Sequence, residues 1–438
     1  MPIVMKFGGT SVADAAAFEN VARIVTAERA AFPVVVVSAM SGVTDALLSA
    51  SVESVGPIFS RHVTTAKELL KEPELEHCID VIKRAEAQVR ESLQTQNSSN
   101  RKSVQDAVVS FGEILSSTLM AAVLNQHGVE ARQVDARCCI ITDEEHTSAV
   151  PLIGETFGRT ENELRPLINS GVVPVLGGFI GATLHGATTT LGRGGSDYTA
   201  ALIGAALNVD EIQIWTDVTG VLTADPRVVP DAQTIDRLSY SEAAELAYFG
   251  AKVLHPKTIQ PAIEFSIPVR ICNSRVPHER GTLVGPQSET SPRTIKAIAH
   301  KTGVTVVQIT SARMLGAYGF LRALFAVFEQ HRTVVDVVTT SEVSVSLSLD
   351  DAHALPAIIE ELEQLGTVGI EKGRGIICVV GEGLRGTPGI AGRVFTTISD
   401  INVSLISQGA SSVNFTFVIE EDRVKEAVTR LHEEFFKR

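Results

Sequence analysis

A glycine-rich stretch between two regular elements is the feature that most limits how this chain can fold. Residues 191–200 read LGRGGSDYTA and separate an apolar strand, VVPVLGG, from TAALIGAALN, which has the spacing of a buried helix. Gly192, Gly194 and Gly195 permit positive φ and close backbone approach, and Ser196 is a good N-cap residue. Backbone N–H groups at such a helix start face an anion.

The glycines alone leave two interpretations open, because a glycine-rich turn between a strand and a helix is often only a turn. Arg193 and Asp197 have no packing reason to stand beside this helix start. They favour a functional anion-binding loop over a plain connection.

The size and charge of the chain limit its class. Its 438 residues exceed the roughly 250 to 300 at which one hydrophobic core stops growing, so at least two domains are expected. The net charge of -13 opposes general binding to nucleic acid or to an anionic membrane. Five cysteines without a CxxC pair fit a reducing compartment, and no apolar run approaches about 18 residues. We therefore expect a cytoplasmic protein without disulfides or a zinc site.

Two further strand-to-helix turns carry polar residues. The first apolar strand contains Lys6, an ammonium near the strand end, and is followed by Gly8 and Gly9. Lys6 is expected to point toward the next loop, with a solvated strand end as the alternative. The second turn, SAMSGVTD, supplies Ser38 and Thr44, whose hydroxyls either bind a polar ligand or only cap the helix.

One predicted helix, residues 103–126, places a carboxylate on an apolar strip. Glu113 shares its face with Val109 and Met120. A buried carboxylate needs a partner, and both a ligand ammonium and a lysine or arginine of the protein remain open.

Strands and helices alternate as far as about Cys272. Thr216 and Asp217 end one of these strands, and nucleotide-binding sheets place ligands at such ends. A turn with Arg227 and the segment FGAKVLHP, which contains Lys252, follow. The alternation predicts an α/β fold, a three-layer sandwich with a mainly parallel sheet covered by helices on both faces.

A polar segment rich in proline and glycine marks a domain boundary, and an internal repeat follows it. We place the first domain at 1–285 and the linker at 286–294. The sequence from Gly319 matches the sequence from Gly389 at a constant offset of 70 residues. Each copy reads as a helix and then strands, so two units side by side form an α+β regulatory module. A dimerisation platform alone is the alternative, but a lone Glu342 at a strand start favours ligand binding.

Several motifs together resemble one family over residues 3–419. They are KFGGTS, SAMSGVTD, GFIG, TTLGRGGSDYTA, WTDV, TADPR, FGAKVLHP and TTSEVSVSL. This set resembles the aspartate kinases, which are amino-acid kinases followed by tandem ferredoxin-like ACT units. The resemblance implies ATP-dependent phosphorylation of the β-carboxylate of L-aspartate to 4-phospho-L-aspartate, the first step toward lysine, threonine, methionine and diaminopimelate.

The resemblance also implies roles for the residues of the first domain. Lys6 would neutralise the transferring phosphoryl group, and Asp197 would order Lys6 or the metal. Arg193 would bind the α-carboxylate of aspartate and Glu113 its ammonium. The other substrate-side residues are Ser38, Thr44, Gly194, Gly195 and Ser196. The nucleotide side comprises Lys6, Gly8, Gly9, Thr216, Asp217, Leu222, Arg227, Lys252 and Val253, with Mg2+ carried by the phosphates of ATP and no metal site of the protein itself. Leu222 stands where the family often has an aromatic residue.

The C-terminal half most resembles the lysine-inhibited members, with Asp336 or Glu342 pairing with the effector's ammonium groups. The implied effector residues are Met314, Ala317, Phe320, Leu321, Val335, Asp336, Ser341 and Glu342. In this family the first ACT unit, here 311–372, is inserted within the second, here 295–310 plus 376–438. A homodimer or a dimer of dimers through these units is expected. A catalytically silent amino-acid sensor and a kinase for another acidic amino acid are the alternatives.

Overall fold

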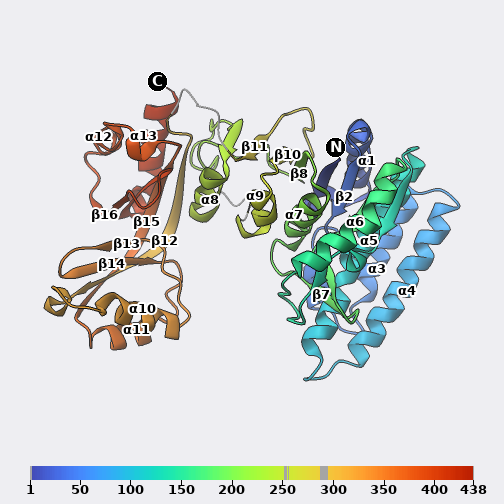
Figure 1. Ribbon diagram of the computed structural model, residues 1–438, viewed down its shortest axis with the longest axis horizontal. Coiled ribbons are helices and arrows are strands. Elements are labelled where there is room, and N and C mark those ends of the chain that lie inside the picture. The colour runs from blue at the N-terminus through green and yellow to red at the C-terminus, as the bar shows by residue number, and fades with distance from the viewer. Residues whose placement is uncertain (1, 251–253, 255, 287–293, 438) are drawn as a thin grey trace. The chain divides into compact units, whose positions relative to one another are not determined.

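The chain forms two compact units (Figure 1). The computed structural model describes residues 2–437 except 251–253, 255 and 287–293. The first unit contains the chain up to Val221, Asp236–Tyr240 and the stretch with β10 (Val269–Asn273) and β11 (Thr282–Gly285). The second contains Leu222–Ile235, the remainder of α8 (Tyr240–Phe249) and the C-terminal region. Two short segments inside the predicted first domain thus belong, by their contacts, to the second unit.

The first unit is built on an eight-stranded sheet in the order β3-β5-β2-β1-β8-β10-β11-β9. Every neighbouring pair is parallel except β10 and β11. The remaining strands are β1 (Ile3–Phe7), β2 (Pro33–Val37), β3 (Ala131–Val134), β5 (Val173–Gly177), β8 (Glu211–Thr216) and β9 (Arg237–Ser239). The predicted mainly parallel sheet is confirmed.

Helices cover both faces because the central strands are apolar on both sides. Ile3, Met5 and Phe7 join the core cluster with α1, α3, α4 and α5. Val4 and Lys6 alternate with these three residues and therefore face the opposite side of the sheet. Helix α7 packs over β1 on that side and contacts α6 and α9. These helices are α1 (Ala15–Ala27), α3 (Gly56–Leu69), α4 (Glu74–Gln94), α5 (Arg101–Gln126), α6 (Ile153–Asn169), α7 (Gly195–Leu207) and α9 (Gln260–Glu264). The result is the predicted three-layer sandwich.

Helix α5 has a high mean hydropathy, although charged and hydroxyl side chains interrupt its apolar residues, as expected. By length and composition it is apolar enough to cross a membrane, with a mean hydropathy of 1.8 in an 18-residue window. However, 78% of that window is buried within the protein. The hydropathy is high because most of this part of the helix lies in the core.

Short elements complete the first unit. Helix α2 (Val43–Leu48) follows β2. A second, three-stranded sheet in the order β4-β6-β7 lies between β3 and α7 along the chain. It consists of β4 (Ile141–Thr142), β6 (Ile180–Thr183) and β7 (Thr188–Thr190), so β7 leads directly into the glycine-rich loop.

The second unit contains one continuous six-stranded sheet in the order β13-β14-β12-β15-β17-β16. Its strands are β12 (Ala297–Thr310), β13 (Val338–Thr340), β14 (Ser344–Leu349), β15 (Thr367–Val380), β16 (Val403–Gln408) and β17 (Asn414–Glu420). The helices α10 (Phe320–Gln330) and α11 (Leu355–Leu362) pack on one core, and α12 (Ile390–Thr397) and α13 (Val424–Phe436) pack on another. The sequence repeat therefore corresponds to two ferredoxin-like units with separate cores.

The two long strands β12 and β15 belong to both ferredoxin-like units. Ala297–Lys301 pairs with Ile376–Val380, beside β17, whereas Val304–Thr310 lies between β14 and the first part of β15. The pairing shifts register between Lys301 and Val304. The predicted assignment of all of 295–310 to the second ACT unit thus differs from the structure, because the end of β12 hydrogen-bonds with β14 of the first.

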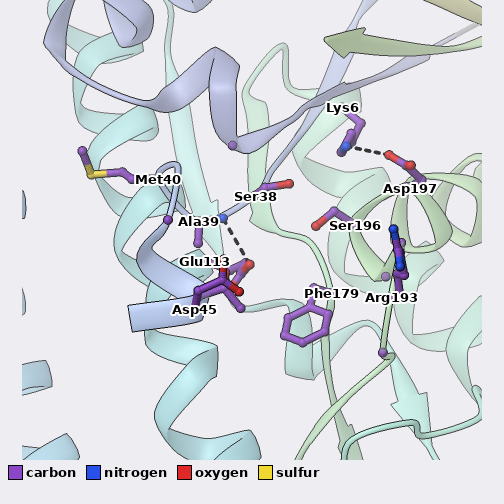
Figure 2. Close-up of a pocket in the computed structure, with 16 residues that line it drawn as sticks. Lys6, Ser38, Ala39, Met40, Asp45, Glu113, Phe179, Arg193, Ser196 and Asp197 are labelled. Atoms are coloured by element: carbon purple, nitrogen blue, oxygen red, sulfur yellow. Dashed lines mark hydrogen bonds and ion pairs between the residues drawn. The ribbon is translucent and has the colours of Figure 1, made fainter. Parts of the chain in front are cut away.

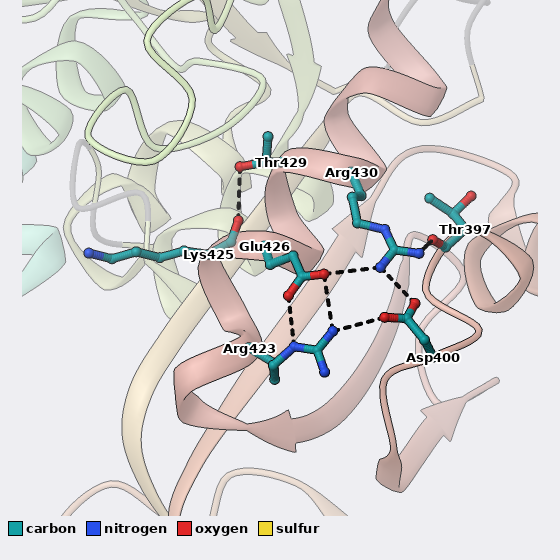
Figure 3. Close-up of polar contacts among 7 residues, drawn as sticks. All are labelled: Thr397, Asp400, Arg423, Lys425, Glu426, Thr429 and Arg430. Carbon is teal, nitrogen blue, oxygen red and sulfur yellow. Dashed lines mark hydrogen bonds and ion pairs between the residues drawn. The ribbon is translucent and has the colours of Figure 1, made fainter.

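A charged network holds α13 to the end of α12. Asp400 pairs with Arg423 at 2.9 Å and with Arg430 at 2.7 Å, and Glu426 pairs with the same two arginines (Figure 3). The four side chains are between 32% and 56% exposed, so solvent screens these pairs and the network contributes little to stability.

Candidate active site

A polar cavity of about 360 Å³ lies in the first unit where β1, β2 and β5 end (Figure 2). Parallel sheets of this kind bind ligands at the carboxyl ends of their strands. The lining residues are Lys6, Gly9, Ser38, Ala39, Met40, Gly42, Thr44, Asp45, Glu113, Phe179, Gly192, Arg193, Gly194, Gly195, Ser196 and Asp197. All the substrate-side residues predicted from the sequence are among them.

Lys6 and Asp197 form an ion pair in this cavity. Lys6 Nζ lies 2.6 Å from Asp197 Oδ1, and the two side chains are 11% and 17% exposed. Lys6 reaches Asp197 because its position in β1 faces α7, and Asp197 occupies the first turn of that helix. The alternative of a solvated strand end is wrong for Lys6.

The glycine-rich loop enters α7 two residues earlier than the sequence indicates. Gly194 is the N-cap residue, with φ +75°, and the helix begins at Gly195. Ser196 therefore lies inside the first turn instead of capping it. The reason is the positive φ of Gly194, which turns the chain into the helix before Ser196 is reached. Ser196 still lines the cavity, where the end of β5 approaches it closely at Gly178.

Glu113 projects into the cavity from the middle of α5. Its Oε1 accepts a hydrogen bond from the backbone N–H of Ala39 at 3.1 Å. Its Oε2 is buried and has no hydrogen-bond partner among the described residues. Burial raises the pKa of this carboxyl to about 8, against the opposing effect of the Ala39 N–H. Of the two partners considered for this carboxylate, an ammonium brought by a ligand fits this geometry.

Arg193 stands on the other side of the cavity from Glu113 in Figure 2. The side chain is exposed. Within the described part of the chain Arg193 makes no hydrogen bond or ion pair, whereas Lys6 is paired with Asp197. Its guanidinium is thus available to an anion. Because no side-chain contact holds the guanidinium, its location depends on the backbone of the loop.

The predicted nucleotide residues are divided between the two units. Thr216 ends β8, next to β1, and Asp217 follows it; Thr216 Oγ1 donates to Asp217 Oδ1 at 3.2 Å. Leu222 and Arg227 belong to the second unit, where Arg227 is bound by Asp225 at 2.6 Å. Gly8 follows β1, and its N–H donates to the carbonyl oxygen of Trp215. Lys252 and Val253 lie outside the described residues.

The predicted effector residues lie in and around the first ferredoxin-like unit. Asp336 accepts a hydrogen bond from the Tyr248 hydroxyl and lies 3.5 Å from Lys301 Nζ. Burial, together with the neighbouring Asp350, raises the pKa of Asp336 to about 8. The residues Met314, Phe320 and Val335 pack against the core of this unit. The residues Ala317, Leu321, Ser341 and Glu342 are exposed.

Five cavity residues outside the glycine-rich loop were not assigned to the site from the sequence: Ala39, Met40, Gly42, Asp45 and Phe179. Phe179 has φ +68°, a conformation that a non-glycine residue rarely adopts. The glycines before it signalled a turn, but nothing in the sequence indicated that the aromatic ring faces the cavity. Among the residues that the structure describes, no three His, Cys, Asp or Glu side chains are grouped as a metal site requires.

The fold and the cavity define an α/β ligand-binding domain followed by a pair of ferredoxin-like units. Comparisons with known proteins assign a family to each part. The amino acid kinase family matches residues 1–273, and an ACT domain matches residues 377–435. Aspartokinase 3, chloroplastic, from Arabidopsis thaliana is 40% identical over 467 residues, which covers 99% of this chain and 81% of the relative.

Two solved structures are similar over their whole length. Escherichia coli aspartokinase III in complex with lysine and aspartate, in the T-state, has a TM-score of 0.84 at 35% identity, covering 99% of both chains. The same enzyme in complex with aspartate and ADP, in the R-state, has a TM-score of 0.81 at 35% identity, covering both chains completely. The chain belongs to the aspartokinases, within the amino acid kinase family.

Proposed function

We propose that this protein transfers the γ-phosphoryl group of ATP to the β-carboxylate of L-aspartate, giving 4-phospho-L-aspartate and ADP. The observation that carries the proposal is the arrangement of one cavity: an ion-paired lysine, a buried carboxylate with a free oxygen, and an unpaired arginine among the described residues. An amino acid with an ammonium and two carboxylates is complementary to these three groups.

In this proposal, Glu113 binds the ammonium of aspartate and Arg193 binds its α-carboxylate. Ser38, Thr44 and Ser196 supply hydroxyl groups around the substrate. These contacts leave the β-carboxylate directed toward Lys6. Positioning of this kind is most of what phosphoryl transfer requires of a protein, because a carboxylate nucleophile needs no strong base.

Lys6 supplies the positive charge at the transferring group. Its ammonium compensates charge that builds up on the phosphoryl oxygens, and Asp197 holds the ammonium in place from the start of α7. Gly8, Gly9, Thr216 and Asp217 at the neighbouring strand ends are the proposed nucleotide contacts of the first unit. Mg2+ bound to the ATP would neutralise part of the charge of its phosphates.

We further propose that L-lysine inhibits the enzyme by binding the first ferredoxin-like unit through Asp336 and Glu342. The exposed apolar side chains of this unit support the predicted homodimer. They include Leu315, Tyr318, Leu321, Phe325, Val334, Val338 and Val343. The buried location of α5 is compatible with the expected cytoplasmic enzyme.

One assay tests the reaction: hydroxamate formation from ATP and aspartate, with glutamate and no amino acid as comparisons. Arg193→Ala is expected to lower kcat/KM for aspartate by roughly ten- to a hundredfold, because a charge-assisted bidentate contact is worth about 1.5 to 3 kcal/mol. Arg23→Ala, which removes an exposed arginine of α1, is the matched control. Equal aspartate kinetics in the two variants would exclude the proposed role of Arg193, and no turnover above background would favour the sensor alternative.

A further inference from the structure

Asp106 is a buried carboxylate with no part in the proposed chemistry. It lies on α5, is fully buried, and is seven residues before Glu113. Seven residues are about two helical turns, so Asp106 and Glu113 project from the same side of the helix, about 10 Å apart along its axis. Burying a carboxylate is costly unless its oxygens are hydrogen-bonded. What it binds therefore indicates why it is there.

Both oxygens of Asp106 bind the chain that surrounds the glycine-rich loop. Thr190 Oγ1 donates to Asp106 Oδ1 at 2.6 Å. His146 Nδ1 lies 2.9 Å from Oδ2, and the Thr147 backbone N–H donates to the same oxygen at 2.9 Å. Thr190 is the last residue of β7 and lies three positions before Arg193.

The segment 146–149, which Asp106 holds, also contacts the backbone of the loop that carries Arg193 (the arginine loop). The Ala149 N–H donates to the Thr190 carbonyl at 2.9 Å. Thr147 has φ +75°, and its carbonyl oxygen lies 3.4 Å from the position of a Cβ on Gly192. A non-glycine residue with positive φ is held there by its surroundings, and the Asp106 carboxylate is one of these contacts. The backbone before Arg193 is thus fixed from α5.

We propose that Asp106 is a positioning residue for aspartate binding and acts through Thr190 on Arg193. Helix α5 would then set both ends of the amino-acid substrate, the ammonium directly through Glu113 and the α-carboxylate indirectly through the arginine loop. This inference rests on the proposed role of Arg193. It predicts that weakening the Asp106 contacts impairs the use of aspartate more than the use of ATP.

Two variants test the contact from its two sides. Asp106→Asn changes the acceptor, and Thr190→Val removes one hydroxyl donor while leaving the His146 and Thr147 contacts in place. Each is expected to raise KM for aspartate roughly five- to tenfold, since small misplacements of a substrate-binding group have effects of this size or larger. KM for ATP should change less than about twofold, the scale expected for an independent site. Thr190→Ser keeps the hydroxyl, so its KM for aspartate should stay close to the wild-type value.

Asn125→Ala is the control for a loss of side-chain hydrogen bonds made by α5 to a neighbouring strand. Asn125 lies near the other end of α5 and makes two hydrogen bonds to the backbone of Ala131, at 2.8 and 3.0 Å. This variant should lower the melting temperature without changing KM for aspartate. A rise in KM equal to that of Thr190→Val would show a general effect of loosening α5 and would overturn the proposal.

A double-mutant cycle with Arg193→Ala separates positioning from folding. If Thr190 acts through Arg193, then Thr190→Val should raise KM for aspartate less than about twofold when Arg193 is already absent. The same rise in both backgrounds, or no rise in the wild-type background, overturns the inference while leaving the role of Arg193 intact. If Arg193→Ala alone leaves aspartate kinetics unchanged, the proposed role of Arg193 fails first, and this inference fails with it.

Discussion

The buried carboxyl of Glu113 leads to a quantitative prediction about stability and pH. Its pKa is raised to about 8 in the folded protein from a usual value of 4.5, mainly because burial disfavours the charged form. Between these two values the folded protein holds a proton that the unfolded chain releases. Raising the pH through this interval therefore lowers stability, and below about 4.5 the effect is absent.

The size of the effect follows from the two pKa values. At pH 7 the unfolded carboxyl is 2.5 pH units above its pKa of 4.5, and each unit corresponds to about 1.4 kcal/mol, so Glu113 lowers the free energy of unfolding by about 3 kcal/mol. At pH 5 the same calculation gives about 1 kcal/mol. Glu113→Gln carries no titrating group and should keep the acceptor oxygen for Ala39. The variant should therefore gain about 2 to 3 kcal/mol relative to wild type between pH 5 and pH 7.

Scanning calorimetry of the full chain measures this gain. The melting temperature of the first unit in Glu113→Gln should rise relative to wild type by roughly 5 to 10 °C between pH 5 and pH 7. Any constant cost of the substitution cancels, because only the change with pH is compared. Glu155→Gln, at an exposed position in the first turn of α6, is the control. Parallel curves for wild type and Glu113→Gln would refute the argument that burial has raised the pKa of Glu113.

Three further predictions concern other parts of the molecule. Lys6→Ala should lower kcat at least a hundredfold with a smaller change in KM for aspartate, in steady-state assays, because its charge acts mainly in the transition state. Asp336→Asn should raise the lysine concentration for half-inhibition at least tenfold, measured by titration, if Asp336 binds an effector ammonium. Asp400→Asn should slightly lower the melting temperature at pH 7. Because Arg430 and Arg423 lower the pKa of Asp400, the difference in melting temperature between wild type and variant should disappear as the pH falls through that pKa.

The sequence predicted most of the substrate side of the cavity because that information is local. Strand ends, glycines and an odd charged residue in an apolar element mark Lys6, Glu113 and Arg193 without knowledge of the fold. The N-cap was misplaced at Ser196, because positive φ at Gly194 is a property of the folded loop.

Other features depend on pairing between distant segments. Asp106 lies on the same side of α5 as Glu113, but its partner Thr190 is 84 positions away in the sequence, so no local pattern connects them. Likewise, the alternation of strands and helices does not reveal that Leu222 and Arg227 make their contacts with the second unit. Such assignments require the tertiary structure.

The sharing of β12 and β15 has a consequence for dividing the protein into parts. The segment matched as an ACT domain, residues 377–435, does not include Ala297–Lys301, which hydrogen-bonds along Ile376–Val380. A fragment beginning at residue 376 would leave one side of that strand unpaired, and an open strand edge recruits another chain. The second ferredoxin-like unit therefore cannot be removed, exchanged or inherited as a contiguous stretch of sequence without leaving part of its sheet behind.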